Sequence, residues 1–148
     1  VIIDERHNGG GWLHNDLAIL LSGRKYMSFE SRGQKLGIEP FTQWTKPSCL
    51  LITENCYSNA NGFPFAYKTL GIGKLIGAPM AGTMTAVWWE SVADGRLTLG
   101  IPEIYCRDNN GRTLENQTLY PDIESHNTPE DLAGGYDRQL MRAIKEMK

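Results

Sequence analysis

The sequence lacks the features of several common classes of protein. Its longest apolar stretches, such as residues 17–21, are far shorter than the roughly 20 residues of a membrane-spanning helix. It has no block of Lys or Arg, and its formal net charge is −2. We therefore expect no membrane span, and no binding to nucleic acid or to an anionic membrane surface.

Cysteine is scarce as well. The three cysteines, Cys49, Cys56 and Cys106, are odd in number and scattered in spacing, which fits neither a disulfide framework nor a zinc site. We expect all three to be small, buried core residues. No metal or cofactor is required by any motif in the chain.

What remains is the composition of a globular domain, with 41% hydrophobic and 22% charged residues. The chain opens directly on an apolar strand at Val1, without a methionine or a signal-like segment. We interpret residues 1–148 as a piece of a longer protein whose upstream strands and functional groups lie outside it. Both the cell envelope and the cytoplasm are compatible with this sequence.

The first half of the chain alternates strands with helices. Residues 1–4 predict a buried strand, residues 9–11 a glycine turn and residues 12–21 a helix. Residues 24–46 are polar and interrupted by glycine and proline, which predicts a largely irregular loop with room for one short strand. Residues 49–53 are continuously apolar, as expected for a strand covered on both faces.

A second helix is predicted around residues 63–70, where Pro64 is tolerable only in the first turn, and residues 74–77 predict another strand. This alternating order favours a parallel α/β architecture. Asp94-Gly95 then predicts a hairpin between residues 86–92 and 97–101. Residues 119–123 predict a short edge strand, and a last helix is expected to start at Thr128.

Two strand-to-helix turns carry the candidate chemistry. The first, residues 4–11, ends in three consecutive glycines whose backbone N–H groups can converge on an anion or a developing oxyanion. A purely structural turn is the alternative. A dinucleotide fingerprint would need glycine at His14, and Gly73-Lys74 is not followed by the Ser or Thr of a phosphate loop, so nucleotide binding is not predicted.

The second turn, residues 54–61, places Ser58 between the apolar strand and the following helix. Small residues, Cys56 and Ala60, stand two positions to either side of Ser58, as a sharp turn that exposes a serine hydroxyl requires. The backbone N–H of Asn59 could face the same point as the glycine turn. An ordinary serine N-cap is the alternative interpretation of Ser58.

Both turns, in this order, resemble the catalytic core of tricorn proteases and C-terminal processing peptidases. The matching strings are IIDERHNGGG, LLITENCYSNANGF, LGIGKLIGAPMAG, DGRLTLGIPE and LENQTLYPDIES, which together cover nearly the whole chain. The resemblance implies an α/β fold of the ClpP/crotonase-like type, with a parallel-rich sheet, flanking helices and a β-hairpin. It also implies that residues 1–148 are the C-terminal part of a serine peptidase catalytic domain.

The resemblance assigns roles to several residues. Ser58 would be the nucleophile, and the backbone amides of Asn59 and of Gly10 or Gly11 would form the oxyanion hole. The C-terminal processing branch uses a lysine base where this chain has Thr83, which favours the tricorn-like branch, with a histidine encoded far upstream.

Glu115 matches the glutamate that, in the tricorn-like branch, helps to orient this histidine through a neighbouring serine. Viewed alone, Glu115 would be an ordinary surface carboxylate.

A serine hydroxyl needs a nearby base to attack at neutral pH. The resemblance assigns this role to none of the local histidines, His7, His14 and His126, for which we expect surface or structural roles. Lys68 and Lys74 would have to be desolvated to act as bases, because an exposed lysine stays protonated near pH 7.

The implied function is peptide-bond hydrolysis through an acyl-enzyme, acting on a peptide or an unfolded protein. The implied partner is the missing upstream part of the same chain. A homo-oligomer is also compatible with the resemblance. Two alternatives remain open: a non-catalytic module of the same fold that binds a hydrophobic ligand, and a crotonase-type acyl-CoA enzyme. Trp88 and Trp89 point to opposite faces of their strand, and residues 25–34 are candidates for shaping substrate specificity.

Overall fold

A four-stranded parallel sheet forms the centre of the computed structural model, which describes residues 1–148. Its strand order is β1 (Ile2–Asp4), β4 (Cys49–Ile52), β5 (Lys74–Gly77) and β8 (Ile123–Glu124). Every neighbouring pair is parallel. The carboxyl ends of these strands therefore meet at one edge of the sheet. The predicted parallel α/β architecture is confirmed.

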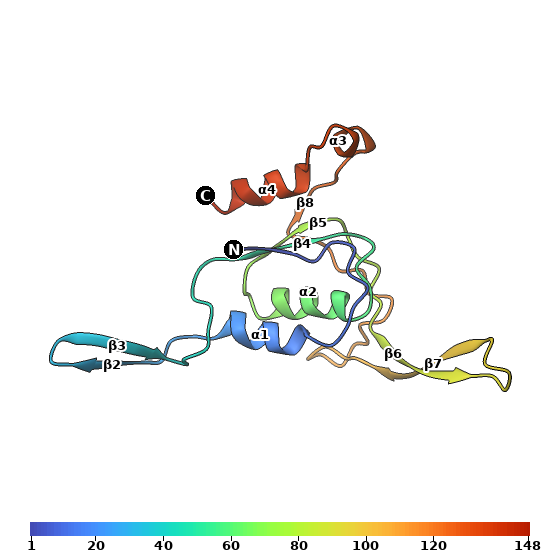
Figure 1. The fold of residues 1–148 in the computed structure, drawn as a ribbon, viewed down its shortest axis with the longest axis horizontal. Coiled ribbons are helices and arrows are strands. Elements are labelled where there is room, and N and C mark those ends of the chain that lie inside the picture. The colour runs from blue at the N-terminus through green and yellow to red at the C-terminus, as the bar shows by residue number, and fades with distance from the viewer.

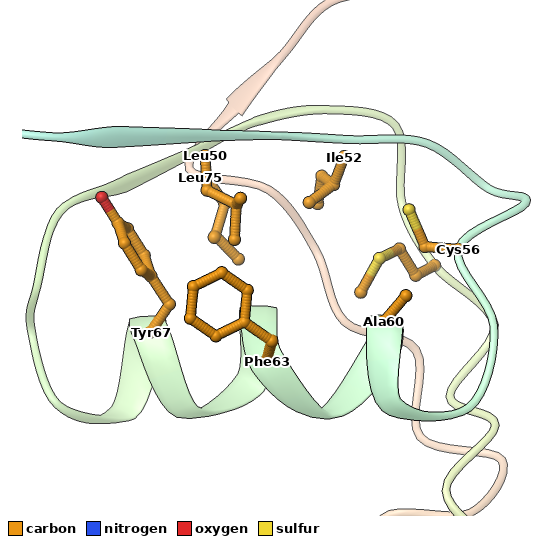
Figure 2. Packing of buried hydrophobic residues seen from close by; sticks show 8 residues of the cluster. Leu50, Ile52, Cys56, Ala60, Phe63, Tyr67 and Leu75 are labelled. Carbon is orange, nitrogen blue, oxygen red and sulfur yellow. The ribbon is translucent and has the colours of Figure 1, made fainter. Parts of the chain in front are cut away.

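Helices cover both faces of this sheet (Figure 1). Helix α2 (Asn59–Thr69) lies against one face with α1 (His14–Ser22) beside it, and α4 (Arg138–Glu146) lies on the opposite face. The side chains of β4 alternate between the two layers, as the pleat of a strand requires. Leu50 and Ile52 pack with Phe63 of α2, in the cluster that Figure 2 shows.

On the other face of β4, Cys49 and Leu51 pack with Ala143 of α4. All four residues of β4 are buried, so this strand is covered on both faces, as its unbroken apolar sequence predicts. The strand therefore gives rigid support to the turn at residues 54–61, which follows its carboxyl end.

Helix α2 begins earlier than its sequence pattern indicates. It starts at Asn59, immediately after Ser58, so Pro64 lies in its second turn and not in its first. The Ser58 carbonyl accepts hydrogen bonds from the backbone of Asn61 (2.8 Å) and Gly62 (3.2 Å), which begins the helix before the first aromatic residue. The expectation for Pro64 was wrong because helical hydrophobic spacing does not reveal where the backbone first becomes helical.

Two antiparallel hairpins project from opposite ends of this body (Figure 1). The first joins β2 (Met27–Ser31) to β3 (Gln34–Glu39), so the largely irregular loop predicted for this region was wrong. Arg32 and Gly33 turn the chain with φ angles of 49° and 80°, the left-handed conformation of a tight hairpin turn. All of β2 and most of β3 are exposed, which explains why their polar sequence resembled a loop.

The second hairpin was predicted. It joins β6 (Thr85–Ser91) to β7 (Thr98–Tyr105), and β7 continues four residues beyond its expected end. Met84, Thr85 and their neighbours at the base of β6 leave the body close to the carboxyl edge of the sheet. This hairpin therefore extends from the region where the two candidate turns lie.

The C-terminal part differs from its prediction in detail. One helix was expected after Thr128, but α3 (Pro129–Ala133) and α4 are separated by residues 134–137, which begin with Gly134 and Gly135. The edge strand expected at residues 119–123 is reduced to a single bridge of Leu119 with Met80 and to the start of β8. No helix of the chain combines the length and the apolar character needed to cross a bilayer.

Candidate active site

The two candidate turns lie side by side because they follow neighbouring parallel strands, β1 and β4. Several hydrogen bonds join them directly: for example, the Tyr57 backbone donates to the Asn8 carbonyl (3.0 Å), and Cys56 Sγ donates to the Glu5 carbonyl (3.3 Å). The sheet therefore sets the separation of the turns, and these bonds set their relative orientation.

Ser58 occupies a strained backbone conformation at the sharp end of the second turn. Its φ of 57° and ψ of −121° lie in a region that residues with a side chain rarely adopt. The Ser58 backbone N–H donates to Thr83 Oγ1 (3.1 Å), which holds the turn from the side. Ser58 stands at the N-cap position of α2, but its side chain does not cap the helix, and the hydroxyl of this half-buried residue forms no hydrogen bond within the chain.

Two backbone N–H groups beside Ser58 are free to bind a ligand. Neither Gly11 nor Asn59, the first residue of α2, donates its backbone N–H to another group of the chain. The Gly10 N–H, in contrast, is already bound to Asn8 Oδ1 (2.8 Å). Between the two glycines considered for an oxyanion hole, Gly11 is thus the one with an available donor.

Gly10 has a different role, because it lets the two turns touch. A Cβ atom at Gly10 would lie 2.8 Å from the Tyr57 carbonyl oxygen, 2.9 Å from Ser58 Cβ and 3.1 Å from the Asn59 nitrogen. Its φ of 103° is also unfavourable for any residue with a side chain. The close approach of the glycine turn to Ser58 depends on this glycine.

Glu115 lies at the base of β6, next to the residue that holds Ser58. Its Oε2 accepts hydrogen bonds from the Met84 backbone (2.7 Å) and from Thr85 Oγ1 (2.8 Å). Thr83, the preceding residue, accepts the Ser58 backbone N–H. Glu115 therefore fixes the segment that supports Ser58, and its other oxygen, Oε1, accepts no hydrogen bond within the chain.

A cleft of about 420 Å³ opens beside Ser58. One wall comes from the two turns and the other from the β6–β7 hairpin. The lining residues are Gly9, Gly11, Trp12, His14, Tyr57, Ser58, Asn59, Met84, Thr85, Ala86, Val87, Trp89, Ile104 and Cys106. Cys106 is half-buried and lines this cleft, so the expectation of three buried cysteines holds only for Cys49 and Cys56.

The three histidines occupy different places. His14 lines the Ser58 cleft, but its Nδ1 is buried without a partner, and no hydrogen bond joins its ring to Ser58. His7 and His126 line a separate cleft, where His126 pairs with Glu124 at 2.8 Å. No group of three or more His, Cys, Asp or Glu side chains lies close enough together to hold a metal ion.

The two lysines considered as bases are both held by carboxylates outside the cleft. Lys68 pairs with Asp122 at 3.0 Å, and Lys74 pairs with Glu146 of α4. Neither lysine lines the cleft beside Ser58.

Glu5 is a buried ionisable residue that the sequence did not single out. The residue is only 8% exposed, and its Oε2 has no hydrogen-bond partner. Burial raises the pKa of the Glu5 carboxyl to about 8, so it is mostly protonated at neutral pH. It lines a smaller cleft of about 210 Å³ behind the glycine turn, together with His14. No sequence signal separated Glu5 from an exposed acid.

The burial of Glu5 predicts a pH dependence of local stability. Below the ordinary pKa of 4.5, Glu5 is protonated in both the folded and the unfolded protein, and folding is not penalised. As the pH rises toward the folded-state pKa of about 8, the unfolded state ionises first, so the folded state loses stability relative to it. Glu5→Gln in the full-length protein should therefore protect the amides of residues 2–12 better than wild type at pH 8, by roughly 1–3 kcal/mol, but not at pH 5. Hydrogen exchange, corrected for intrinsic rates, measures this difference.

Glu54→Gln is the matched control, because Glu54 is an exposed carboxylate in the adjacent turn. It should leave the pH dependence of protection unchanged. Identical pH profiles for wild type and Glu5→Gln would show that Glu5 is not buried as a neutral acid.

Comparison with known proteins identifies the family of this chain. The sequence profile of peptidase family S41 matches residues 1–125, most of the chain. The chain belongs to peptidase family S41. It is 31% identical to the tricorn protease of Thermoplasma acidophilum over 97% of the chain and 14% of that protein. It is 27% identical to tricorn protease homolog 1 of Streptomyces coelicolor, over 97% of this chain and 14% of that protein.

Solved structures place this S41 chain in the same fold. The crystal structure of the tricorn protease superposes with a TM-score of 0.83 at 26% identity, over 98% of this chain and 14% of that one. The photosystem II D1 C-terminal processing protease shares the fold with a TM-score of 0.61 at 18% identity, over 90% of this chain and 36% of that one. The predicted ClpP-like fold and the suspected peptidase family are confirmed.

Proposed function

We propose that this S41 chain carries the nucleophile and the oxyanion hole of a serine peptidase, with Ser58 as the nucleophile. The observation that carries the proposal is the position of the Ser58 hydroxyl, at a strained turn with the free N–H groups of Gly11 and Asn59 beside it. Strained strand-to-helix turns that expose a serine are typical of hydrolase nucleophiles.

The reaction proceeds through an acyl-enzyme. Ser58 Oγ attacks the carbonyl carbon of the scissile peptide bond while a base accepts the hydroxyl proton. The carbonyl oxygen becomes an oxyanion, which the backbone N–H groups of Gly11 and Asn59 stabilise. The C–N bond then breaks as the base returns the proton to the leaving amine, and water hydrolyses the ester by the same route.

The base is a histidine from outside residues 1–148. Two observations support this assignment: no group of the chain hydrogen bonds to the Ser58 hydroxyl, and Lys68 and Lys74 are paired with carboxylates outside the cleft. Glu115 is the positioning residue. Its Oε2 secures the base of β6, and its free Oε1 is available to orient the histidine through an intervening hydroxyl.

The chain is accordingly the C-terminal part of a catalytic domain. It spans only 14% of the length of the tricorn protease that it matches, so most of such a protein lies beyond the matched region. The proposed substrate is a peptide or an unfolded protein, because the cleft beside Ser58 is open and extends along a hairpin that an extended chain could follow.

Covalent labelling tests the proposal. A fluorophosphonate probe reacts with serines that are activated as nucleophiles, and we expect it to label the full-length protein stoichiometrically. Mass spectrometry of the digested product should place the adduct on Ser58. Heat-denatured protein, as the control, should not react, because the oxyanion hole and the base are lost on unfolding.

The alternatives predict other outcomes. A module that only carries a hydrophobic ligand would bind lipid tightly and remain unlabelled. A crotonase-type enzyme would process an acyl-CoA without an adduct on Ser58. Absence of labelling, or an adduct on another serine, would overturn the proposed nucleophile.

A further inference from the structure

Two adjacent tryptophans on β6 have different surroundings. Trp88 and Trp89 are both largely exposed, at 58% and 66%, and as neighbours in a strand they face opposite sides of the hairpin. Only Trp89 lines the cleft that contains Ser58. The pair thus offers one aromatic side chain inside the cleft and a matched one outside it.

Gly100 holds the Trp89 ring in a defined position. Trp89 pairs with Gly100 across the hairpin, and a Cβ atom at Gly100 would lie 3.0 Å from Trp89 Cζ3 and 3.2 Å from Cη2. The six-membered part of the indole therefore lies over the backbone of β7, in space that any larger residue would fill. This arrangement keeps the ring against the hairpin surface, where it forms part of the cleft wall.

The rest of the hairpin wall is apolar. Beyond Trp89, it is formed mainly by Met84, Ala86, Val87 and Ile104, and none of the 14 lining residues of the cleft is Asp, Glu, Lys or Arg. A charged side chain entering this space would lose water without gaining an opposite charge, which is costly. An apolar side chain would instead bury its surface against the wall.

We propose that Trp89 is a specificity-determining residue, which selects peptides that place a large apolar side chain beside the scissile bond. This inference rests on the proposed function of Ser58. The side chain would pack against the Trp89 ring while its backbone carbonyl lies near Ser58, Gly11 and Asn59. Glu or Lys at the same substrate position would be disfavoured.

Internally quenched peptides test the proposal on the full-length protein. They differ only in the residue next to the cleaved bond, which is Phe, Ala or Glu, and mass spectrometry verifies the cleavage site. Wild type should prefer Phe over both Ala and Glu in kcat/KM. Trp89→Ala should reduce the Phe-to-Ala preference by about 10- to 100-fold, mainly by slowing cleavage of the Phe peptide. Gly100→Val, which displaces the ring, should shift the preference in the same direction.

Trp88→Ala is the matched control, and it should leave the preference unchanged. The rate of Ser58 labelling by a small fluorophosphonate lacking a peptide side chain should be the same in wild type and Trp88→Ala, and Ser58 of Trp89→Ala should still be labelled. If Trp89→Ala is labelled normally and keeps its Phe-to-Ala preference, the proposed role of Trp89 is refuted, while the proposed nucleophile is not. Absence of labelling in wild type would instead refute the proposed nucleophile.

Discussion

Replacing Ser58 with alanine in the full-length protein is expected to lower peptidase activity by roughly 10⁵- to 10⁶-fold. Removing a serine nucleophile has an effect of this order, because the remaining oxyanion hole can only assist slow attack by water. The substitution removes one oxygen atom that has no hydrogen-bond partner in the chain. The fold should therefore be retained. Activity is measured as kcat/KM on a quenched peptide, and fold by circular dichroism.

Ser125→Ala is a suitable control for this experiment. Ser125 is a half-buried serine directly after β8 and does not line the Ser58 cleft. Its replacement should leave activity and fluorophosphonate labelling close to wild type. Undiminished cleavage by a folded Ser58→Ala protein would eliminate the acyl-enzyme mechanism at this site.

A single methyl group at Gly10 should have the second-largest effect. In Gly10→Ala the new Cβ would meet the Tyr57 carbonyl oxygen at 2.8 Å and Ser58 Cβ at 2.9 Å, at a φ of 103° that alanine disfavours. The two turns would have to separate, which would misalign the N–H groups of Gly11 and Asn59. Loss of one oxyanion donor typically lowers kcat by about 10²- to 10³-fold, and we expect a decrease of this size.

The neighbouring glycine supplies the control for Gly10. A Cβ atom at Gly9 would meet nothing within 4 Å, so Gly9→Ala should retain most of the activity. The decrease for Gly10→Ala should appear both in kcat and in the rate of fluorophosphonate labelling. Equal kcat values for the two variants would show that contact between the turns does not position the oxyanion hole.

The sequence predicted the sharp turn at Ser58 more accurately than it predicted the exposed hairpin β2–β3. The apolar run of β4 followed by small residues around Ser58 indicated a sharp, exposed turn, and the strained backbone at Ser58 agrees. The hairpin β2–β3 was missed because its strands are exposed, so they lack the apolar alternation that identifies a half-buried strand. The early start of α2 was missed because the Ser58 carbonyl, not a side chain, begins the helix.

The sequence did not show which backbone N–H groups are free to bind a ligand. The three consecutive glycines 9–11 look equivalent in the sequence, yet Gly10 donates to Asn8 while the Gly11 N–H is free. Thr83 was noticed only as the absence of a lysine, whereas its hydroxyl accepts the Ser58 backbone N–H. Glu5 directly follows β1, a partly exposed strand, and only the three-dimensional structure shows that Glu5 itself is buried.

By itself, the sequence determined the order of β1, α1, β4, α2 and β5, the two turns and the identity of the residues at their tips, because these depend on local hydrophobic patterns and on glycine. The tertiary structure decided which of these groups meet. Parallel pairing of β1 with β4 brings turns some 50 residues apart to the same sheet edge, and the pleat and twist of the β6–β7 hairpin place Trp89 in the cleft and Trp88 outside it. Such contacts between distant segments depend on packing in three dimensions, which a one-dimensional pattern does not specify.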